Sequence, residues 1–318
     1  SHLVVAPFPG APPAAVYAEA ASDGRPFFVV PWNGLYLIGT TDVRYDGDPG
    51  DVAIDDRELD YLVRETERLF PDSGGIRERV LYTMAGVRAL PFAPGRAEGA
   101  ITRRHIVHAH RDARGLYSIV GGKLTTYRAL ARDVLERLSR DGVVPRDRLL
   151  AGTGAERLPG AIAGTERDML RAELVHVFDE RTADRMLRTY GRLSARLLAE
   201  ATERTELALP ASPGAELRRV ELVHAFETEW AETLVDLLQR RTMLGLGADF
   251  GFAEMRAAAA ALVELGIWDG TRAEEEIASY RRFASLRRAS SALPLDGSAQ
   301  SQRRSSGAHA PDQARRRQ

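Results

Sequence analysis

The stretch GLYSIVGGKLTTYRALA, at residues 115–131, changes character at its two central glycines. Its first half is a β-rich apolar run, and its second half opens a helix expected from Leu124 to Leu138. Glycines leave room for another molecule at the backbone, and the start of a helix presents free N–H groups and a partial positive charge. The junction therefore predicts a docking place for an anionic or electron-accepting ring, although an ordinary strand-to-helix turn with a capping threonine has the same pattern.

The sequence before this junction is rich in strands. Six short β-rich runs are separated by turns, at 3–6, 27–32, 35–41, 80–90, 105–110 and 116–121. The pair Asn33-Gly34 signals a tight hairpin, so neighbouring strands are expected to be mostly antiparallel. One helix interrupts the strands, and it is expected between Asp55 and Phe70.

After Gly122 apolar residues recur every three or four positions, which is the helical period. Five further segments keep this period, at 165–178, 183–202, 215–244, 253–265 and 271–288. We therefore expect an α+β fold, in which a mostly antiparallel sheet ends in a strand–turn–helix and is followed by an all-α C-terminal domain. The expected boundaries place the sheet part at 1–142, the helical domain at 143–289 and a disordered basic tail at 290–318.

The composition of the 318 residues excludes several classes of protein. The 44 basic and 45 acidic residues nearly cancel, so no overall basic field is available to hold nucleic acid. The absence of cysteine removes disulfides, thiolate metal sites and thiol nucleophiles. No apolar run is long enough to span a membrane and the start does not have the pattern of a signal peptide, so a cytoplasmic location is expected, with attachment to a membrane surface left open.

Lys123 is the only lysine in the chain, and every other basic residue is an arginine. A lysine amine is compact and its pKa shifts readily, so it can serve where a planar guanidinium cannot. Lys123 directly follows the glycines of the junction, which makes it a candidate catalytic and ligand-binding residue. Chance survival of one lysine is the alternative.

Two other segments carry arginines that suit an anion. In TMAGVRAL, at residues 83–90, Arg88 stands among uncharged residues, and strand alternation places it on the face of Met84 and Gly86. A guanidinium there favours a carboxylate or a phosphate as ligand, and pairing with a nearby acid is the equal alternative. Arg103, at the mouth of the next strand, is a second candidate anion ligand.

The histidines at 105–110 do not predict a metal site. His108 and His110 share one strand face and His105 lies on the other, which leaves two ligands where a metal site needs three or four. We therefore expect no metal. Nor is an intact nucleotide-phosphate loop expected, because the glycines at 152–157 lack the third glycine of the dinucleotide pattern and the segment 245–250 follows a helix rather than a strand.

Five blocks taken together resemble the FAD-dependent glycerol-3-phosphate dehydrogenases of the amino-acid-oxidase-like flavoprotein superfamily. They are GRPFFVVPW at 24–32, LYLIGTTDVRYDGDP at 35–49, TMAGVRALP at 83–91, AITRRHIV at 100–107 and GLYSIVGGKLTTYRALA at 115–131. Their order and spacing agree with the family. The helical half is similar to the family's C-terminal domain, and the resemblance covers about residues 1–265.

This resemblance implies FAD as the cofactor and gives each candidate residue a role. The residues implied to face the pyrimidine edge of the flavin ring are Gly121, Gly122, Lys123, Leu124 and Thr125. Backbone N–H groups and the helix start would stabilise the anionic reduced flavin there. Arg88 and Lys123 would lie beside the substrate, Arg103 would help hold its phosphate, and His2 would lie near the reacting carbon.

The implied reaction is oxidation of sn-glycerol 3-phosphate to dihydroxyacetone phosphate, with electrons passed on to a membrane quinone and hence peripheral membrane contact. Chains of the family begin with a glycine-rich loop for the FAD diphosphate, whereas this sequence begins at a point that resembles the middle of the family. We therefore expect a C-terminal portion that is completed by an N-terminal FAD-binding half. The alternatives are an oxidase that uses oxygen, a flavin-dependent amine or amino-acid oxidase, and a non-catalytic remnant that acts as an interaction module.

Overall fold

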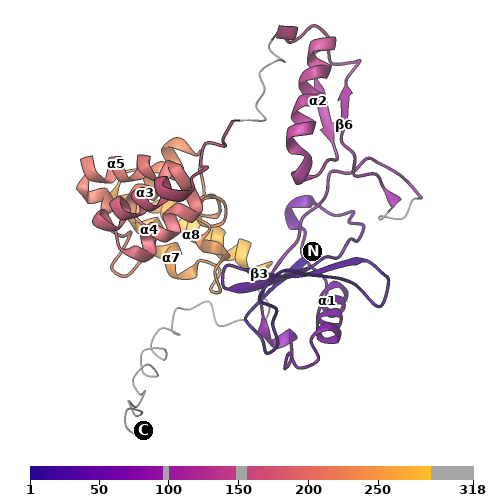
Figure 1. Cartoon of the computed structure of the whole chain (residues 1–318), viewed down its shortest axis with the longest axis horizontal. Coiled ribbons are helices and arrows are strands. Elements are labelled where there is room, and N and C mark those ends of the chain that lie inside the picture. Colours follow the sequence, from indigo (N-terminus) through magenta and orange to yellow (C-terminus); the bar gives the residue numbers. More distant parts are fainter. Residues whose placement is uncertain (96–99, 148–155, 288–318) are drawn as a thin grey trace.

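The computed structural model describes residues 1–95, 100–147 and 156–287, and it confirms the predicted α+β fold. The described chain has three parts: an antiparallel sheet backed by one helix, a projecting hairpin with a helix, and a domain of helices (Figure 1). The domain boundary expected at residue 142 stays a prediction. The tail expected at 290–318 lies outside the described residues.

The main sheet has five strands in the order β2-β3-β4-β1-β5, and every neighbouring pair is antiparallel, as expected. The strands are β1 (His2–Val5), β2 (Val16–Glu19), β3 (Pro26–Trp32), β4 (Leu35–Gly39) and β5 (Val80–Met84). Asn33 and Gly34 join β3 to β4 with positive φ angles of 52° and 74°, which the hairpin signal predicted. Strand β2 was not predicted, because four residues carry too little alternation to stand out.

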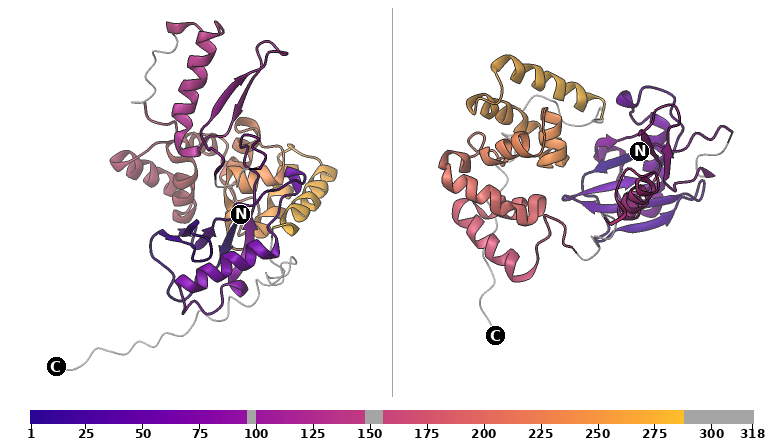
Figure 2. Two further views of the ribbon diagram at one scale, coloured as in Figure 1. Left: turned by 90° about the vertical axis from the view of Figure 1, so that its right-hand side faces the viewer. Right: turned by 90° about the horizontal axis from the view of Figure 1, so that it is seen from above.

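Strand β1 is buried on both faces, because each face of the sheet packs against a different partner. Leu3 and Val5 share a core with Leu62 of α1 (Asp56–Leu69), the helix that lies across one face of the sheet (Figure 1). Val4, on the opposite face, belongs to the core of the helical domain, which lies beside the sheet (Figure 2). The central strand therefore joins two hydrophobic cores.

The strand expected at 80–90 ends at Met84. His2 of β1 lies directly opposite Met84, and the residues that follow Met84 pair with no strand in the described ranges. The alternation that placed Arg88 on the face of Met84 and Gly86 was therefore wrong, because the segment that carries Arg88 is not part of a ladder. Its position is set by other contacts, described below.

A hairpin and one helix project from the sheet on the side away from α1 (Figure 1). Strand β6 (Ile106–Ala109) pairs antiparallel with β7 (Tyr117–Val120), a 3-10 turn follows at Leu124–Thr126, and α2 (Tyr127–Arg140) packs against β6. The expected strand, turn and helix are thus present in this order, although the α-helix begins at Tyr127 rather than at Leu124. No residue of α2 is buried in the described structure. An amphipathic helix normally buries one face, so this unit is incompletely packed.

The C-terminal domain is helical, as its spacing predicted. Its helices are α3 (Gly164–Val177), α4 (Glu180–Tyr190), α5 (Ser194–Glu203), α6 (Arg219–Val223), α7 (Phe252–Glu264) and α8 (Gly270–Ser285). Across the described ranges no helix has both the length and the apolar character that crossing a membrane requires.

Two of the expected helices are interrupted. The segment 183–202 is divided at Gly191, whose φ of 57° ends α4 and whose missing Cβ lets a neighbouring backbone carbonyl approach. The segment 215–244 holds only the short α6 and two π-helical turns, at His224–Thr228 and Asp236–Arg241. Between these turns Trp230 has a φ of 55°, a left-handed conformation that periodicity alone does not reveal.

Tyr82 links the sheet to the helical domain, because its buried hydroxyl donates a hydrogen bond of 2.7 Å to the Leu246 carbonyl oxygen. In the Tyr82→Phe variant this buried carbonyl loses its partner, so the free energy of unfolding should fall by about 1–2 kcal/mol. Urea denaturation measures the loss. Tyr17→Phe is the control, since Tyr17 is 58% exposed, and equal midpoints for the two variants would contradict the link.

Candidate functional site

Arg88 and Arg103 meet at one carboxylate, that of Asp42. Arg88 Nη1 lies 2.9 Å from Asp42 Oδ2, and Arg103 Nη2 lies 3.4 Å from the same oxygen. The acid partner considered for Arg88 is therefore present, and it brings the two predicted anion ligands together. The arginine side chains are 39% and 49% exposed, so each keeps N–H donors open to a ligand. Sequence reasoning missed Asp42, although its place in the GTTD block was an available signal.

The glycine turn is fastened to both arginine-bearing segments. Gly121 N–H donates to the Ala89 carbonyl oxygen at 2.7 Å, and Gly122 N–H donates to that of Arg103 at 3.1 Å. The φ angles of the two glycines are 76° and 99°, which side chains rarely tolerate. A Cβ on Gly121 would also lie 3.0 Å from the Arg104 carbonyl oxygen. Glycine is therefore needed here for the turn itself, apart from any ligand.

Lys123 stands just before the 3-10 turn in an extended backbone conformation. Its side chain is exposed and has no ion-pair partner within the described ranges. The N–H groups of Leu124 and Thr125 have no partner earlier in the turn, and the Leu124 side chain is 90% exposed. A capping threonine, the alternative considered for this junction, is absent, because the Thr126 hydroxyl donates back to the Lys123 carbonyl oxygen at 3.0 Å.

His2 begins β1 and lies between Gly39 of β4 and Met84 of β5. Its ring occupies the space over Gly39, where a Cβ would come within 2.2 Å of His2 Cδ2. Burial, then the positive amino group of the chain and then Arg88 lower the pKa of His2 from 6.5 to about 4. His2 is therefore neutral at neutral pH and able to accept a proton.

The hairpin histidines have separate partners. His105 Nε2 is 2.8 Å from Asp133 Oδ2, and His110 Nε2 is 2.8 Å from Ser118 Oγ. His108 and His110 lie edge to face on one side of the hairpin, with ring centroids 4.8 Å apart. Within the part of the chain that is described, His, Asp and Glu side chains nowhere gather in the group of three that a metal ion would need.

The site therefore combines cationic donors, one carboxylate, a neutral imidazole and a half-buried glycine turn that is followed by exposed residues. Guanidinium groups are suited to a phosphate or carboxylate because their planar N–H forks match the oxygen spacing. The N–H groups of Leu124 and Thr125, which have no partner earlier in the turn, and the Lys123 amine fit the electron-rich edge of a flavin ring.

Comparison with known protein families agrees with this geometry. Residues 1–128 match the family described as FAD dependent oxidoreductase, and residues 151–273 match the C-terminal domain of alpha-glycerophosphate oxidase. The fold is thus that of an FAD-dependent oxidoreductase. Within that class, the chain belongs to the glycerol-3-phosphate dehydrogenase family, as the resemblance of its motifs predicted.

Relatives of known name support this placement. The chain is 36% identical over 290 residues to the glycerol-3-phosphate dehydrogenase of Synechocystis sp., covering 89% of this chain and 52% of that protein. It is 31% identical over 256 residues to the D-erythritol 1-phosphate dehydrogenase of Brucella abortus, covering 76% of this chain and 48% of the relative. A solved structure of the glycerol-3-phosphate dehydrogenase from Bacillus halodurans, complexed with FAD, matches 90% of this chain and 56% of its own at 25% identity and a TM-score of 0.71. The chain spans about half the length of the relatives it matches.

Gly39→Ala tests how His2 is held. The new Cβ would collide with the His2 ring, so the imidazole must move out of its buried place, and its pKa should rise from about 4 toward 6.5. Titration of the His2 ring protons by NMR measures the shift. Gly86→Ala is the matched control, because a Cβ there meets nothing within 4 Å; an unchanged His2 titration in Gly39→Ala would contradict the packing.

The lowered pKa of His2 also predicts how stability depends on pH. Between pH 6.5 and about 4 the unfolded chain binds a proton at His2 that the folded chain does not. Stability should therefore fall as pH falls through this window, with a slope from His2 below about 1.4 kcal/mol per pH unit. Urea midpoints measured across the window should decline less steeply for His2→Gln than for the unaltered chain. Parallel declines would show that His2 is not held neutral.

Proposed function

We propose that this chain forms the substrate-covering and flavin-facing half of an FAD-dependent dehydrogenase that oxidises sn-glycerol 3-phosphate to dihydroxyacetone phosphate. The observation that carries the proposal is the pair of backbone hydrogen bonds that fasten the Gly121–Gly122 turn to the segments of Arg88 and Arg103. These bonds support the proposal because they join the turn, which would receive the ring edge, to the segments of the two arginines, which would bind the phosphate. Neither feature alone would separate this enzyme class from other flavoproteins.

In this proposal the turn and the residues after it hold FAD. The residues that would contact it are Gly121, Gly122, Lys123, Leu124 and Thr125. When bound, FAD supplies the two-electron acceptor for the hydride on C2 of the substrate. The free N–H groups of the turn and the Lys123 amine place partial and full positive charge where negative charge develops on reduction.

The same proposal assigns roles to the remaining polar residues. Arg103 and Arg88 together bind the phosphate, and Arg88 and Lys123 also stabilise the negative charge that builds on the C2 oxygen as its proton leaves. His2 accepts that proton, because burial disfavours its charged form and so keeps the imidazole neutral at neutral pH. Relatives named for glycerol 3-phosphate and for erythritol 1-phosphate support a phosphorylated polyol as the substrate class.

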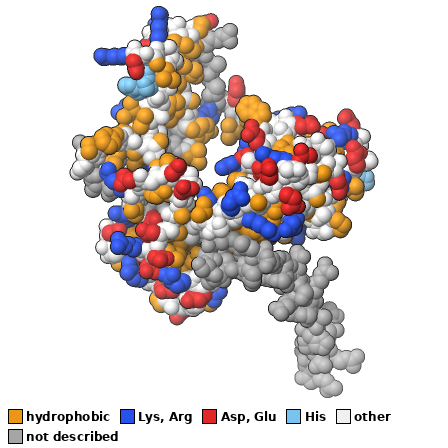
Figure 3. Space-filling model, turned by 180° about the vertical axis from the view of Figure 1, so that it is seen from behind, with side chains coloured by type: hydrophobic (Ala, Val, Ile, Leu, Met, Phe, Trp, Pro, Cys, Tyr) orange, Lys and Arg blue, Asp and Glu red, His pale blue; other side chains and the backbone are white. Residues whose placement is uncertain are grey.

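The proposed partner is an N-terminal half that supplies the glycine-rich FAD-diphosphate loop. The projecting unit supports it, because an isolated two-stranded hairpin is only marginally stable and no residue of α2 is buried. Hydrophobic side chains gather over this unit on the molecular surface (Figure 3), and Leu124, Ile106 and Leu116 among them are 90%, 44% and 51% exposed. Exposed apolar patches of this kind mark interfaces.

We further propose that electrons leave the reduced cofactor for a membrane quinone, and that the assembled protein touches the membrane surface without spanning it. Glycerol 3-phosphate oxidation by the assembled protein should then reduce a soluble quinone analogue and release little hydrogen peroxide. Peroxide formed in step with substrate loss would instead identify an oxidase.

The activity itself can be tested by fusing the FAD-binding half of the Synechocystis relative ahead of Ser1. The fusion should bleach the flavin and reduce a dye when sn-glycerol 3-phosphate is added. Lys123→Ala and Arg88→Ala should each lower kcat/KM by about 100-fold, because each removes a charge that stabilises the transition state. Stopped-flow absorbance of the flavin measures the reaction.

Arg114→Ala is the control for this experiment, since Arg114 is an exposed arginine between β6 and β7. Its rate should match that of the unaltered fusion. Full activity in both site variants would remove the residue assignment, and turnover of an amino acid without turnover of glycerol 3-phosphate would overturn the proposed substrate class.

A further inference from the structure

We propose that Asp42 is a positioning residue, which holds Arg88 and Arg103 together as one phosphate-binding pair. The inference rests on the function proposed above and adds to it the group that organises the phosphate site. It follows from three observations on the described residues: the hydrogen bonds that anchor Asp42, the contacts of the two arginine side chains, and the distribution of charge among the three residues.

Asp42 is anchored to the sheet and to α1. The preceding Thr41 donates its N–H to the Ser1 carbonyl oxygen at 3.2 Å and its hydroxyl to the Glu58 carboxylate of α1. Arg25 Nη1 donates to the carbonyl oxygen of Asp42 itself at 3.1 Å. Thr41 is buried, and the Asp42 side chain is only 23% exposed. The carboxylate therefore extends from a fixed backbone.

The two arginines lie in loop segments, Arg88 beyond the end of β5 and Arg103 before the start of β6. Their backbones are held through their carbonyl oxygens, which accept from Leu90 N–H and from Gly122 N–H, whereas their side chains are long and 39% and 49% exposed. Within the described residues Asp42 is the side chain to which both guanidinium groups are bonded. The Asp42 carboxylate therefore orients the two arginine side chains, which would otherwise adopt separate rotamers.

The Asp42 carboxylate also reduces the repulsion between the two positive charges. Two guanidinium groups within reach of one oxygen repel each other, and Asp42 offsets this repulsion while leaving the trio with a net charge of +1. Both arginines use the same oxygen, Oδ2, and each guanidinium has five N–H donors. Most donors thus remain free to bind a phosphate, which enters a pair that is already assembled.

A contribution to stability alone does not explain this arrangement. Ion pairs as exposed as these contribute little to the free energy of unfolding. The effect of removing the Asp42 charge should therefore be seen in the arginines and in phosphate binding, while the thermal midpoint of the chain hardly changes.

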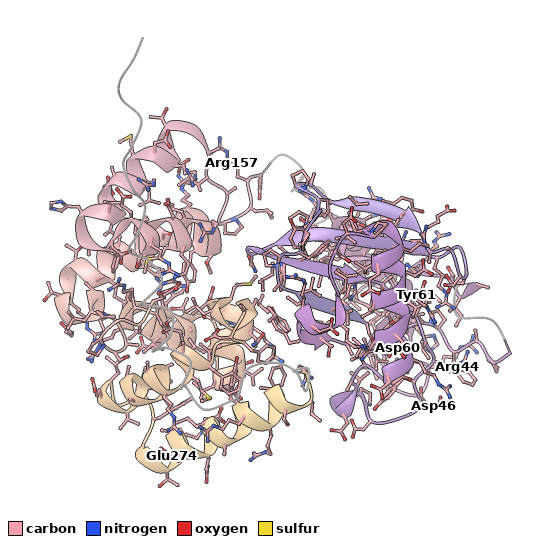
Figure 4. The ribbon with its side chains drawn as sticks, turned by 90° about the horizontal axis from the view of Figure 1, so that it is seen from below. Arg44, Asp46, Asp60, Tyr61, Arg157 and Glu274 are labelled. Atoms are coloured by element: carbon pink, nitrogen blue, oxygen red, sulfur yellow. The ribbon has the colours of Figure 1, made fainter. Side chains whose placement is uncertain are left out.

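The 318-residue chain itself gives the first test. Phenylglyoxal modifies the unprotonated guanidine, so an arginine paired with a carboxylate reacts slowly, and peptide mass spectrometry measures each rate. Asp42→Asn should speed modification of Arg88 and of Arg103 by about threefold or more, because both lose the same charged partner. Asp46→Asn is the matched control from the same loop, where Asp46 is exposed at the surface of the sheet part (Figure 4). Unchanged rates at either arginine in Asp42→Asn would overturn the proposal.

Inorganic phosphate is the probe for the second test. In the unaltered chain phosphate should protect Arg88 and Arg103 with one common midpoint, and in Asp42→Asn the midpoints should rise by about tenfold and separate. Asp42→Glu, which keeps the charge, should restore part of the protection. A lower midpoint in Asp42→Asn would mean that the carboxylate competes with phosphate, and absence of protection in the unaltered chain would mean that the pair is no phosphate site; either result overturns the proposal.

The fused enzyme separates a positioning role from a catalytic one. Asp42→Asn should raise KM for sn-glycerol 3-phosphate by about tenfold and leave kcat within about threefold, since the phosphate takes no part in the bond changes at C2 and the variant keeps the charge of Arg88. An equal loss in kcat with no change in KM would contradict positioning. If the unaltered fusion oxidises no glycerol 3-phosphate, the proposed function fails while the two phenylglyoxal tests still decide the role of Asp42.

Discussion

Strand β1 can occupy the centre of this structure only because both of its faces are covered. Leu3 and Val5 need α1 on one side, and Val4 needs the helical domain on the other. His2 is the first residue of this strand. The packing of Leu3, Val4 and Val5 into the two cores therefore fixes where its imidazole lies. A histidine at a frayed edge would be solvated and largely protonated in mild acid, whereas one anchored by a buried strand is held neutral.

Much of this architecture could be predicted from the sequence because its signals are local. The Asn33-Gly34 hairpin, the strand–turn–helix around Gly121 and Gly122 and the helical period of the second half each depend on neighbouring residues. The end of β5 could not be predicted in this way. Where a strand stops pairing depends on partner strands elsewhere in the fold, and a run of apolar residues does not contain that information.

The site shows the same limit. Arg88, Arg103, Lys123 and the glycines were identified from residue type and motif, and the structure joins the arginine segments to the turn through backbone hydrogen bonds. Asp42 was missed because an aspartate after a strand usually belongs to a solvated turn, and its importance depends on two arginines that are distant in sequence. The faces of residues 85–90 were predicted wrongly for a related reason, since alternation has meaning only within a ladder.

This site combines side chains that are held in fixed positions with long side chains that can adjust to a ligand. The groups that must not move are the His2 imidazole, which β1 holds over Gly39, and the Asp42 carboxylate, whose neighbour Thr41 is bonded to Glu58 of α1. Segments without regular structure supply the long side chains that must reach a ligand. Such side chains lose rotamer entropy when they bind, and a carboxylate that gathers them beforehand reduces that loss. Because Asp42 neutralises only one of the two guanidinium charges, the assembled pair still attracts an anion; a second carboxylate would cancel the attraction and a site with none would splay its arginines apart.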